Sequence, residues 1–278
     1  MNNPTAPPKM ILIAGPCVME SYELMYNTAK FLSDISKRYD LDFTFKCSFD
    51  KANRTSIDSY RGPGIKKGLN MMSELKKTLN LKTLTDVHET SECEPAAKVV
   101  DVLQIPAFLC RQTDLIYEAS KVAKAINIKK GQFLSPQEIK HSIKKAYDAG
   151  NRNIMVTERG SCFGYNNLVV DFRSIPIMKE FGVPVIYDAT HSLQMPGTNG
   201  NQTGGKREYI PTLAKAAIIS GCDGIFMEVH EDPDKALSDS ATQIPISYVT
   251  DLIEQMVKVY NLQKTLSEIK IPNYEISK

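Results

Sequence analysis

Short runs of apolar and β-branched residues recur along the 278-residue chain, and each precedes a stretch with helical spacing of apolar positions. The predicted strands are 10–17, 42–49, 82–88, 99–107, 126–133, 153–160, 184–191 and 224–231. The predicted helices lie around 22–39, 64–80, 90–98, 112–125, 135–150, 167–182, 207–221 and 247–266. Eight such alternations favour an α/β chain folded as a single (β/α)8 TIM barrel over residues 1–278. A short extension at 1–9 and a tail at about 267–278 are expected at its ends.

Local signals agree with these boundaries. The segment Ser135-Pro136-Gln137-Glu138 is typical of a helix N-cap with proline at the first helical position, and Gly150 and Gly182 are predicted helix stops. The main competing fold is a doubly wound open sheet. It normally carries a glycine-rich phosphate motif after its first strand, and Ala14-Gly15-Pro16-Cys17 is not one.

Net charge and targeting signals restrict the class of function. The net charge is only +2 and the basic residues are scattered, which argues against nucleic acid or a membrane surface as a partner. No segment has the length of a membrane span, and the N-terminal residues lack the pattern of a signal peptide. A cytoplasmic protein is therefore expected, and its six cysteines, which lack paired spacing, are not expected to form a disulfide framework.

Four possible metal ligands fall at predicted strand ends, where the active groups of such barrels gather. Cys17 ends the first strand, His191 ends the seventh, Glu228 lies in the eighth and Asp239 lies in the loop beyond it. These strands are neighbours in a closed barrel, so the side chains can converge. A thiolate, an imidazole and two carboxylates suit zinc, iron, manganese or a similar divalent cation. Each residue could instead be an inert buried one, and His230 is an alternative ligand on the same strand face as Glu228.

Cations also point into the predicted barrel. Alternation turns Lys46 inward, where an ammonium group is costly unless an anion meets it. Strand 126–133 supplies Lys129 or Lys130, and strand 153–160 supplies Arg159. The loop after the second strand adds groups that suit phosphate: Lys51, Asn53, Arg54 and Ser56. A solvated loop is the alternative for that segment, but together the cations predict a substrate with more than one negative charge.

The segment 197–207 is long, rich in glycine and asparagine, and ends in Lys206 and Arg207. Its position after the seventh predicted strand favours a mobile lid over the barrel mouth. An ordinary flexible loop is the alternative.

Seven motifs in order carry a family resemblance that covers about residues 10–260. They are IAGPC at 13–17, KCSFDKANRTS at 46–56, TDVHE at 85–89, QIPAFL at 104–109, NIKKGQF at 127–133, TERG at 157–160 and DATHSLQ at 188–194. The chain closely resembles the 3-deoxy-D-manno-octulosonate-8-phosphate synthases. The resemblance implies condensation of phosphoenolpyruvate with D-arabinose 5-phosphate, with release of phosphate, for the core sugar of lipopolysaccharide. The related heptulosonate-phosphate synthases, which use erythrose 4-phosphate, carry a shorter Lys-Pro-Arg-Thr-type sequence at the second motif.

The resemblance also implies roles for individual residues. Cys17 matches the metal-dependent members, which have Cys where the metal-independent ones have Asn, and the matching metal ligands are Cys17, His191, Glu228 and Asp239. The positions that match the reacting centre are Cys17, Lys46, Asp86 and His191. The positions that match substrate-binding residues are Lys51, Asn53, Arg54, Ser56, Gln104, Pro106, Ala107, Phe108, Lys129, Arg159 and Gln194. The family is commonly homotetrameric, and Arg111 is expected to reach a neighbouring subunit's site.

Two further readings of the same barrel stay open at this level. Inward lysines also suit an aldolase that forms a Schiff base with its substrate. The second alternative is a catalytically silent barrel that serves as a binding module. Such a barrel should lack site residues, whereas every expected position is filled in this sequence.

Overall fold

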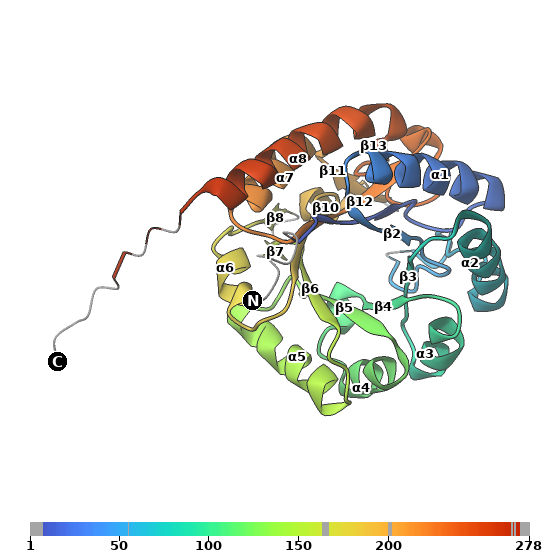
Figure 1. Ribbon diagram of the computed structural model, residues 1–278. Helices are drawn as coiled ribbons and strands as arrows, with labels where there is room; N and C mark the ends of the chain where they lie inside the picture. The colour runs from blue at the N-terminus through green and yellow to red at the C-terminus, as the bar shows by residue number, and fades with distance from the viewer. Residues whose placement is uncertain are drawn as a thin grey trace, which may run out of the picture.

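The computed structural model describes residues 8–54, 56–162, 167–199, 202–267, 269 and 271–272. Its main parallel strands are β1 (Ile11–Gly15), β2 (Asp42–Lys46), β3 (Thr83–Asp86), β4 (Val102–Ile105), β5 (Ala125–Lys129), β6 (Ile154–Glu158), β9 (Val185–Asp188) and β12 (Gly224–His230). They follow one another in chain order around the sheet, and β1 pairs with both β2 and β12. The sheet is therefore a closed barrel surrounded by helices (Figure 1), which confirms the predicted TIM barrel and excludes the open doubly wound sheet.

Helices follow the strands as the amphipathic spacing predicted. They are α1 (Tyr22–Arg38), α2 (Ile65–Leu79), α3 (Thr90–Ala97), α4 (Thr113–Val122), α5 (Ile139–Asp148), α6 (Ser174–Lys179), α7 (Ile210–Ile219) and α8 (Val249–Thr265). Ser135 is the N-cap and Pro136 opens the 3-10 turn η2 (Pro136–Glu138), as predicted, and the turn leads into α5; Ser135 and Glu138 also form a capping box. Gly150 and Gly182, with φ of 93° and 72°, follow α5 and α6 as expected of helix stops.

The sixth helix is shorter than predicted. The pattern indicated a helix from about 167, but α6 begins at Ser174. The residues before it include β8 (Leu168–Val169), which pairs antiparallel with β7 (Ser161–Cys162), so a ribbon takes the place of the first helical turns.

Short elements complete the loops at and around the barrel. They are β10 (Gln194–Asn199), β11 (Gln202–Gly205), β13 (Ile244–Pro245), η1 (Ala107–Leu109), η3 (His191–Leu193), η4 (Arg207–Tyr209), η5 (Pro233–Lys235) and η6 (Ile246–Tyr248). Strands β10 and β11 form an antiparallel hairpin where the lid was predicted, with residues 200–201 outside the described part. The described residues of these two strands thus pair with each other, and the motion of the segment stays a prediction. Residues 1–7 and most of the predicted tail at 267–278 also lie outside the described residues.

The barrel interior holds a small apolar cluster separate from the main core between strands and helices. It consists of Ile13, Leu84, Val102, Ile186 and Phe226, one from each of five strands. This layer fills the barrel below the polar site, so burial of apolar surface, rather than the site, supplies the driving force for closure.

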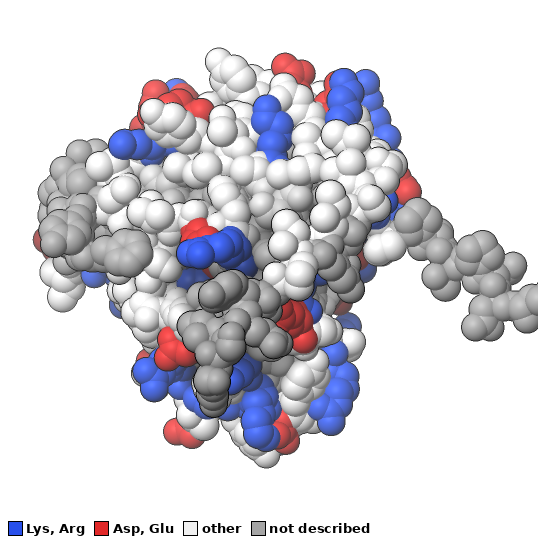
Figure 2. All heavy atoms as spheres, turned by 90° about the vertical axis from the view of Figure 1, so that its left-hand side faces the viewer, with Lys and Arg blue, Asp and Glu red and all other residues white. Residues whose placement is uncertain are grey.

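The remaining bulk predictions concern membranes, disulfides and surface charge. Among the described helices, none combines the length and the hydrophobicity that crossing a bilayer requires. Five cysteines are buried without forming a disulfide: Cys17, Cys47, Cys93, Cys110 and Cys222. Figure 2 shows Lys and Arg side chains interleaved with Asp and Glu on one face, as the small net charge suggests.

Candidate active site

A cavity of about 530 Å³ opens where the barrel strands end. It gathers most of the predicted site residues: Lys46, Lys51, Asn53, Arg54, Asp86, Gln104, Pro106, Ala107, Phe108, Lys129, Arg159, His191, Gln194 and Asp239. Cys17 and Glu228 lie fully buried beside it. Ser56 does not line it, and the Ser56 hydroxyl instead accepts a hydrogen bond from the backbone N–H of Asp58 within the loop.

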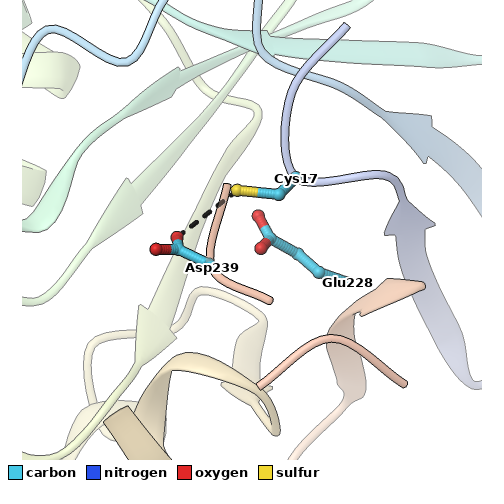
Figure 3. Close-up of side chains that lie close together, drawn as sticks. All are labelled: Cys17, Glu228 and Asp239. Carbon is cyan, nitrogen blue, oxygen red and sulfur yellow. Dashed lines mark hydrogen bonds between the residues drawn. The ribbon is translucent and has the colours of Figure 1, made fainter. Parts of the chain in front are cut away.

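Three groups that could bind a metal come together here: Cys17 just after β1, Glu228 in β12 and Asp239 in the loop beyond β12. The ligand atoms of Cys17, Glu228 and Asp239 lie within 4.8 Å of one another, and Figure 3 shows the three side chains pointing at a common point. The Cys17 thiol donates to Asp239 Oδ2 at 3.3 Å. Asp239 has a φ of 47°, a left-handed conformation that aspartate tolerates better than most residues. Local backbone geometry thus turns this loop carboxylate toward the barrel.

His191 completes the group from the adjoining strand end. Its Nε2 lies 3.5 Å from Glu228 Oε1 and 3.7 Å from Asp239 Oδ2. Its Nδ1 faces Asp188 Oδ2 at 2.8 Å, so the carboxylate holds the proton on Nδ1 and leaves the Nε2 lone pair directed at the cluster. His230, the alternative ligand, is held elsewhere: its Nδ1 accepts from the N–H of Asp232 and its Nε2 faces Glu20.

The donor set fits a divalent cation. Glu228 Oε2 is buried and has no hydrogen-bond partner, which is costly for a carboxylate oxygen. Burial, together with Asp239 and Glu228, raises the pKa of the Cys17 thiol well above its usual value, so a thiolate needs a positive charge close by. A cation bound by sulfur, imidazole and carboxylates would satisfy both groups.

Two buried lysines occupy the inner end of the cavity. Lys46 Nζ donates to Glu228 Oε1 at 2.9 Å, and Lys129 Nζ donates to Asp188 Oδ2 at 2.6 Å. Both ammonium groups lie over the Phe226 ring, Lys129 at 3.8 Å from its centre. Burial lowers the pKa of Lys46, but Glu228, Asp86 and Cys17 together outweigh it and the pKa is raised, whereas burial keeps the pKa of Lys129 below its usual value. The two cations are thus held in fixed positions above the apolar layer.

The structure gives Lys129 and Lys130 different places, which strand alternation alone had left as alternatives. Lys129 lines the cavity, whereas the fully buried Lys130 lies 3.4 Å from Glu158 and donates to the carbonyls of Gly131 and Leu134. Lys129 is therefore the substrate candidate, and Lys130 ties the ends of β5 and β6 together.

Arg159 differs from the lysines in its partners. It is 7% exposed, and its guanidinium donates only to the His191 carbonyl at 3.1 Å and to Gln194 Oε1 at 2.7 Å. Its Nε is buried without a partner, and no carboxylate among the described residues lies within ion-pair distance. A buried guanidinium without a counter-ion is poised to bind an anion.

The loop after β2 brings further cations to the cavity, Lys51 toward its inner end and Arg54 toward the loop that carries Asp239. Lys51 lies 3.8 Å from Glu228, and Arg54 donates to the Ser238 hydroxyl at 2.5 Å and lies 3.7 Å from Asp239. Ser238 Oγ is also 2.9 Å from Cys17 Sγ. Ser238 therefore connects the loop that is predicted to bind phosphate with the Cys17 sulfur of the candidate metal site.

Sequence reasoning missed four residues that shape this site. Asp188 orients both Lys129 and His191, Phe226 supports the lysines, Ser238 joins two loops, and His88 lines the cavity beside Asp86. Asp188 and His88 stand at strand ends within quoted motifs, so position alone was a usable signal for them. Nothing in the local sequence distinguishes Phe226 or Ser238, because their roles depend on distant neighbours.

Comparison with known proteins agrees with this geometry. Residues 6–265 match the model of the DAHP synthetase I family. The chain is 53% identical to a 2-dehydro-3-deoxyphosphooctonate aldolase of Desulfotalea psychrophila, over 90% of this chain and 89% of the relative. It is 52% identical to the protein of that name from Legionella pneumophila, over 93% and 94% of the two chains, and 51% identical to that of Helicobacter hepaticus, over 91% and 97%. The chain therefore belongs to the DAHP synthetase I family, in the octulosonate-phosphate branch that the motifs indicated.

Proposed function

We propose that the cavity is the site where phosphoenolpyruvate condenses with D-arabinose 5-phosphate and water. The products are 3-deoxy-D-manno-octulosonate 8-phosphate and inorganic phosphate, consistent with the name of the relatives. Arg159 is the observation that carries this assignment to the cavity, because its buried guanidinium has no direct carboxylate partner among the described residues and an unpartnered Nε, which suits an anionic ligand. The fully filled site and the identity of the relatives leave the silent barrel and the Schiff-base aldolase without support.

Phosphoenolpyruvate is assigned to the inner end of the cavity. Arg159 and Lys129 supply the charges for its phosphate and carboxylate, Lys51 adds a third cation, and Gln104 and Gln194 supply neutral groups. Pro106 and Ala107 line the wall of this subsite. The pairing of Lys129 with Asp188 fixes the ammonium group before substrate arrives, so little reorganisation is needed on binding.

The sugar phosphate is assigned to the mouth of the cavity. Arg54 and Asn53 belong to the loop after β2 and line the opening, and Phe108 forms the wall opposite the buried end. Arg54 donates to Ser238 and lies close to Asp239, so phosphate would compete with these partners for the guanidinium. Two phosphates at opposite ends of one cavity hold the aldehyde and the enol carbon in reach of each other.

The chemistry requires one carbon–carbon bond and one carbon–oxygen bond, from water to C2, to form, and the C2–oxygen bond to phosphate to break, with the proton of the water released. The C3 carbon of phosphoenolpyruvate attacks the aldehyde carbon, whose oxygen takes up a proton, and water adds to C2 before phosphate leaves. Lys46, Asp86 and His191 line the cavity and are the groups that can hold or move these protons. Burial raises the pKa of Asp86, but His88 and Lys46 outweigh it and keep the pKa well below its usual value, so Asp86 is a carboxylate at neutral pH.

We also propose a divalent metal, of the zinc, iron or manganese type, held by Cys17, His191, Glu228 and Asp239. The support is the clustering of the ligand atoms of Cys17, Glu228 and Asp239, the approach of His191 Nε2 to both carboxylates, and the unpartnered Glu228 oxygen. When bound, such an ion supplies Lewis acidity that orients the aldehyde or activates water. The chain's own contribution is the position of the four side chains and the hydrogen bond from His191 Nδ1 to Asp188.

A cytoplasmic homotetramer is the proposed working form. Buried cysteines without disulfides suit a reducing compartment, and Phe108 and Phe133, exposed to 56% and 54%, leave apolar surface near the cavity mouth for a second subunit. Arg111 lies next to this surface in the chain and is the residue proposed to reach a neighbouring site. Light scattering on the purified protein tests the tetramer, and a monomer at micromolar concentration would contradict it.

A substrate comparison tests the function. Phosphate release from phosphoenolpyruvate is measured with arabinose 5-phosphate and, in parallel, with erythrose 4-phosphate. We expect release to be stoichiometric with the eight-carbon product and fast only with the pentose. Faster turnover with erythrose 4-phosphate would move the chain to heptulosonate synthesis, and a borohydride-trapped adduct would indicate a Schiff base. Full turnover of chelator-treated Cys17→Asn and wild-type protein alike would rule out an obligatory metal.

A further inference from the structure

His88 is a buried charged group at the cavity wall that the proposed mechanism leaves without a task. It lies two residues after Asp86, in the turn between β3 and α3. Its Nε2 is 3.3 Å from Asp86 Oδ2, its Nδ1 is 3.7 Å from Glu92 Oε2, and its ring packs edge-on against Phe49. The imidazole is thus held between two carboxylates, one inside the cavity and one outside it.

Glu92 is fixed more firmly than an ordinary helix residue. Its Oε2 accepts the backbone N–H of His88 at 2.7 Å and of Glu89 at 3.2 Å, which closes the first turn of α3. The side chain is only 17% exposed. A single carboxylate oxygen therefore sets both the backbone at His88 and the charge next to its ring.

Asp86 is the end of this chain of contacts. The hydroxyl of Ser48 donates to Asp86 Oδ1 at 2.5 Å, while the second oxygen faces His88. Both Asp86 and His88 line the cavity, and Glu92 does not. Whatever orients His88 therefore also orients Asp86, a carboxylate that the proposed mechanism uses to hold or move protons.

We propose that Glu92 is a positioning residue, which acts through His88 to hold Asp86 in its working orientation and ionisation state. The titratable groups that face His88 are Asp86 from β3 and Glu92 from α3, and Lys46 and Lys51 act on Asp86 from the other side. Burial lowers the pKa of His88, but the two carboxylates outweigh it and raise the pKa to about 9. Imidazolium is thus the form present at neutral pH, and Glu92 adds to Asp86 in keeping it protonated into the alkaline range.

Charge and hydrogen bonding can be separated by one substitution. In Glu92→Gln the amide oxygen still accepts the two backbone N–H groups, so a purely structural cap is kept, whereas the negative charge beside His88 is lost. We expect the pKa of His88 to fall by about one unit, from the loss of an opposite charge at this distance. The alkaline limb of kcat/KM moves to lower pH by the same amount, with kcat reduced more than KM. The matched control is Glu94→Gln, in the same helix but exposed and paired with Lys98. It should leave the His88 pKa and the pH profile of kcat/KM unchanged.

Nuclear magnetic resonance titration of the imidazole signals is the direct readout. The chain has four histidines, and the His88 signal is assigned by its loss in His88→Asn. An unchanged His88 titration in Glu92→Gln overturns the proposal, and so does a shifted titration with an unchanged rate profile. The kinetic arm rests on the proposed function. A wild-type protein without condensing activity would refute that function instead, and the titration would still decide whether Glu92 controls His88.

Discussion

Removal of the Asp188 charge tests the inner half of the site most sharply. Asp188 is fully buried and accepts Lys129 at 2.6 Å and His191 Nδ1 at 2.8 Å. Asp188→Asn keeps the volume but leaves Lys129 without its counter-ion, and breaking a buried pair in this way costs about 3–5 kcal/mol. The amide can also present its NH2 group to His191, so the imidazole is free to change tautomer. Loss of such an outer partner lowers metal affinity by about 10- to 100-fold.

The stability deficit should depend on pH in a known direction. Burial already lowers the pKa of Lys129, and without Asp188 it falls further, so the ammonium group can lose its proton as pH rises. The deficit is therefore largest near neutral pH and shrinks in alkaline solution. Urea unfolding at two pH values and titration with cobalt(II), followed by its thiolate absorption, measure the two effects. The control is Asp171→Asn, at an exposed pair with Arg173, which should change stability by no more than about 0.5 kcal/mol. Wild-type stability and wild-type metal affinity in Asp188→Asn would refute the reasoning.

Other substitutions test neighbouring features of the same barrel end. Glu158→Gln leaves the buried Lys130 without its ion-pair partner and should lower the free energy of unfolding, measured in urea, by about 3 kcal/mol. The double variant that also carries Lys130→Met should recover most of this lost stability. Arg159→Lys removes the guanidinium fork and should raise KM for phosphoenolpyruvate by about 10- to 100-fold, from about 1.5–3 kcal/mol for a charged hydrogen bond; an unchanged KM in steady-state assays would remove Arg159 from that subsite. Gly15→Ala places a Cβ 2.0 Å from the Lys46 carbonyl oxygen, so it should lower both the melting temperature and kcat by forcing β1 from β2; a wild-type melting curve would contradict this.

The fold followed from sequence because its signals are local and repeated. Each strand is a short apolar run followed by an amphipathic helix, and eight repeats leave few arrangements besides the closed barrel. The start of α6 was misplaced because pairing between β7 and β8 overrides local helix spacing. Barrel geometry also explains why the metal candidates could be named: Cys17 and Glu228 lie on adjoining strands once the barrel closes.

The ion pairs between side chains inside the site could not be predicted from the sequence. Lys129 on β5 meets Asp188 on β9, across the barrel interior and past β6, and no periodicity records such a contact. Strand alternation left Lys129 and Lys130 as alternatives for a related reason, and only the family resemblance named Lys129. Both side chains are buried, and only their partners, Asp188 for one and Glu158 for the other, decide which one belongs to the cavity.

Shared carboxylates make the two halves of the site one electrostatic unit. Glu228 belongs to the candidate metal cluster and is also the counter-ion of Lys46, and Asp188 orients the candidate ligand His191 while it neutralises Lys129. A cation at the cluster would compete with Lys46 for Glu228 and leave more of the Lys46 charge directed toward the cavity. Metal binding and binding of an anionic substrate should therefore favour each other, because each relieves the charge that the other leaves. The lysines and the carboxylates are accordingly parts of one arrangement, whose balance depends on every member being present.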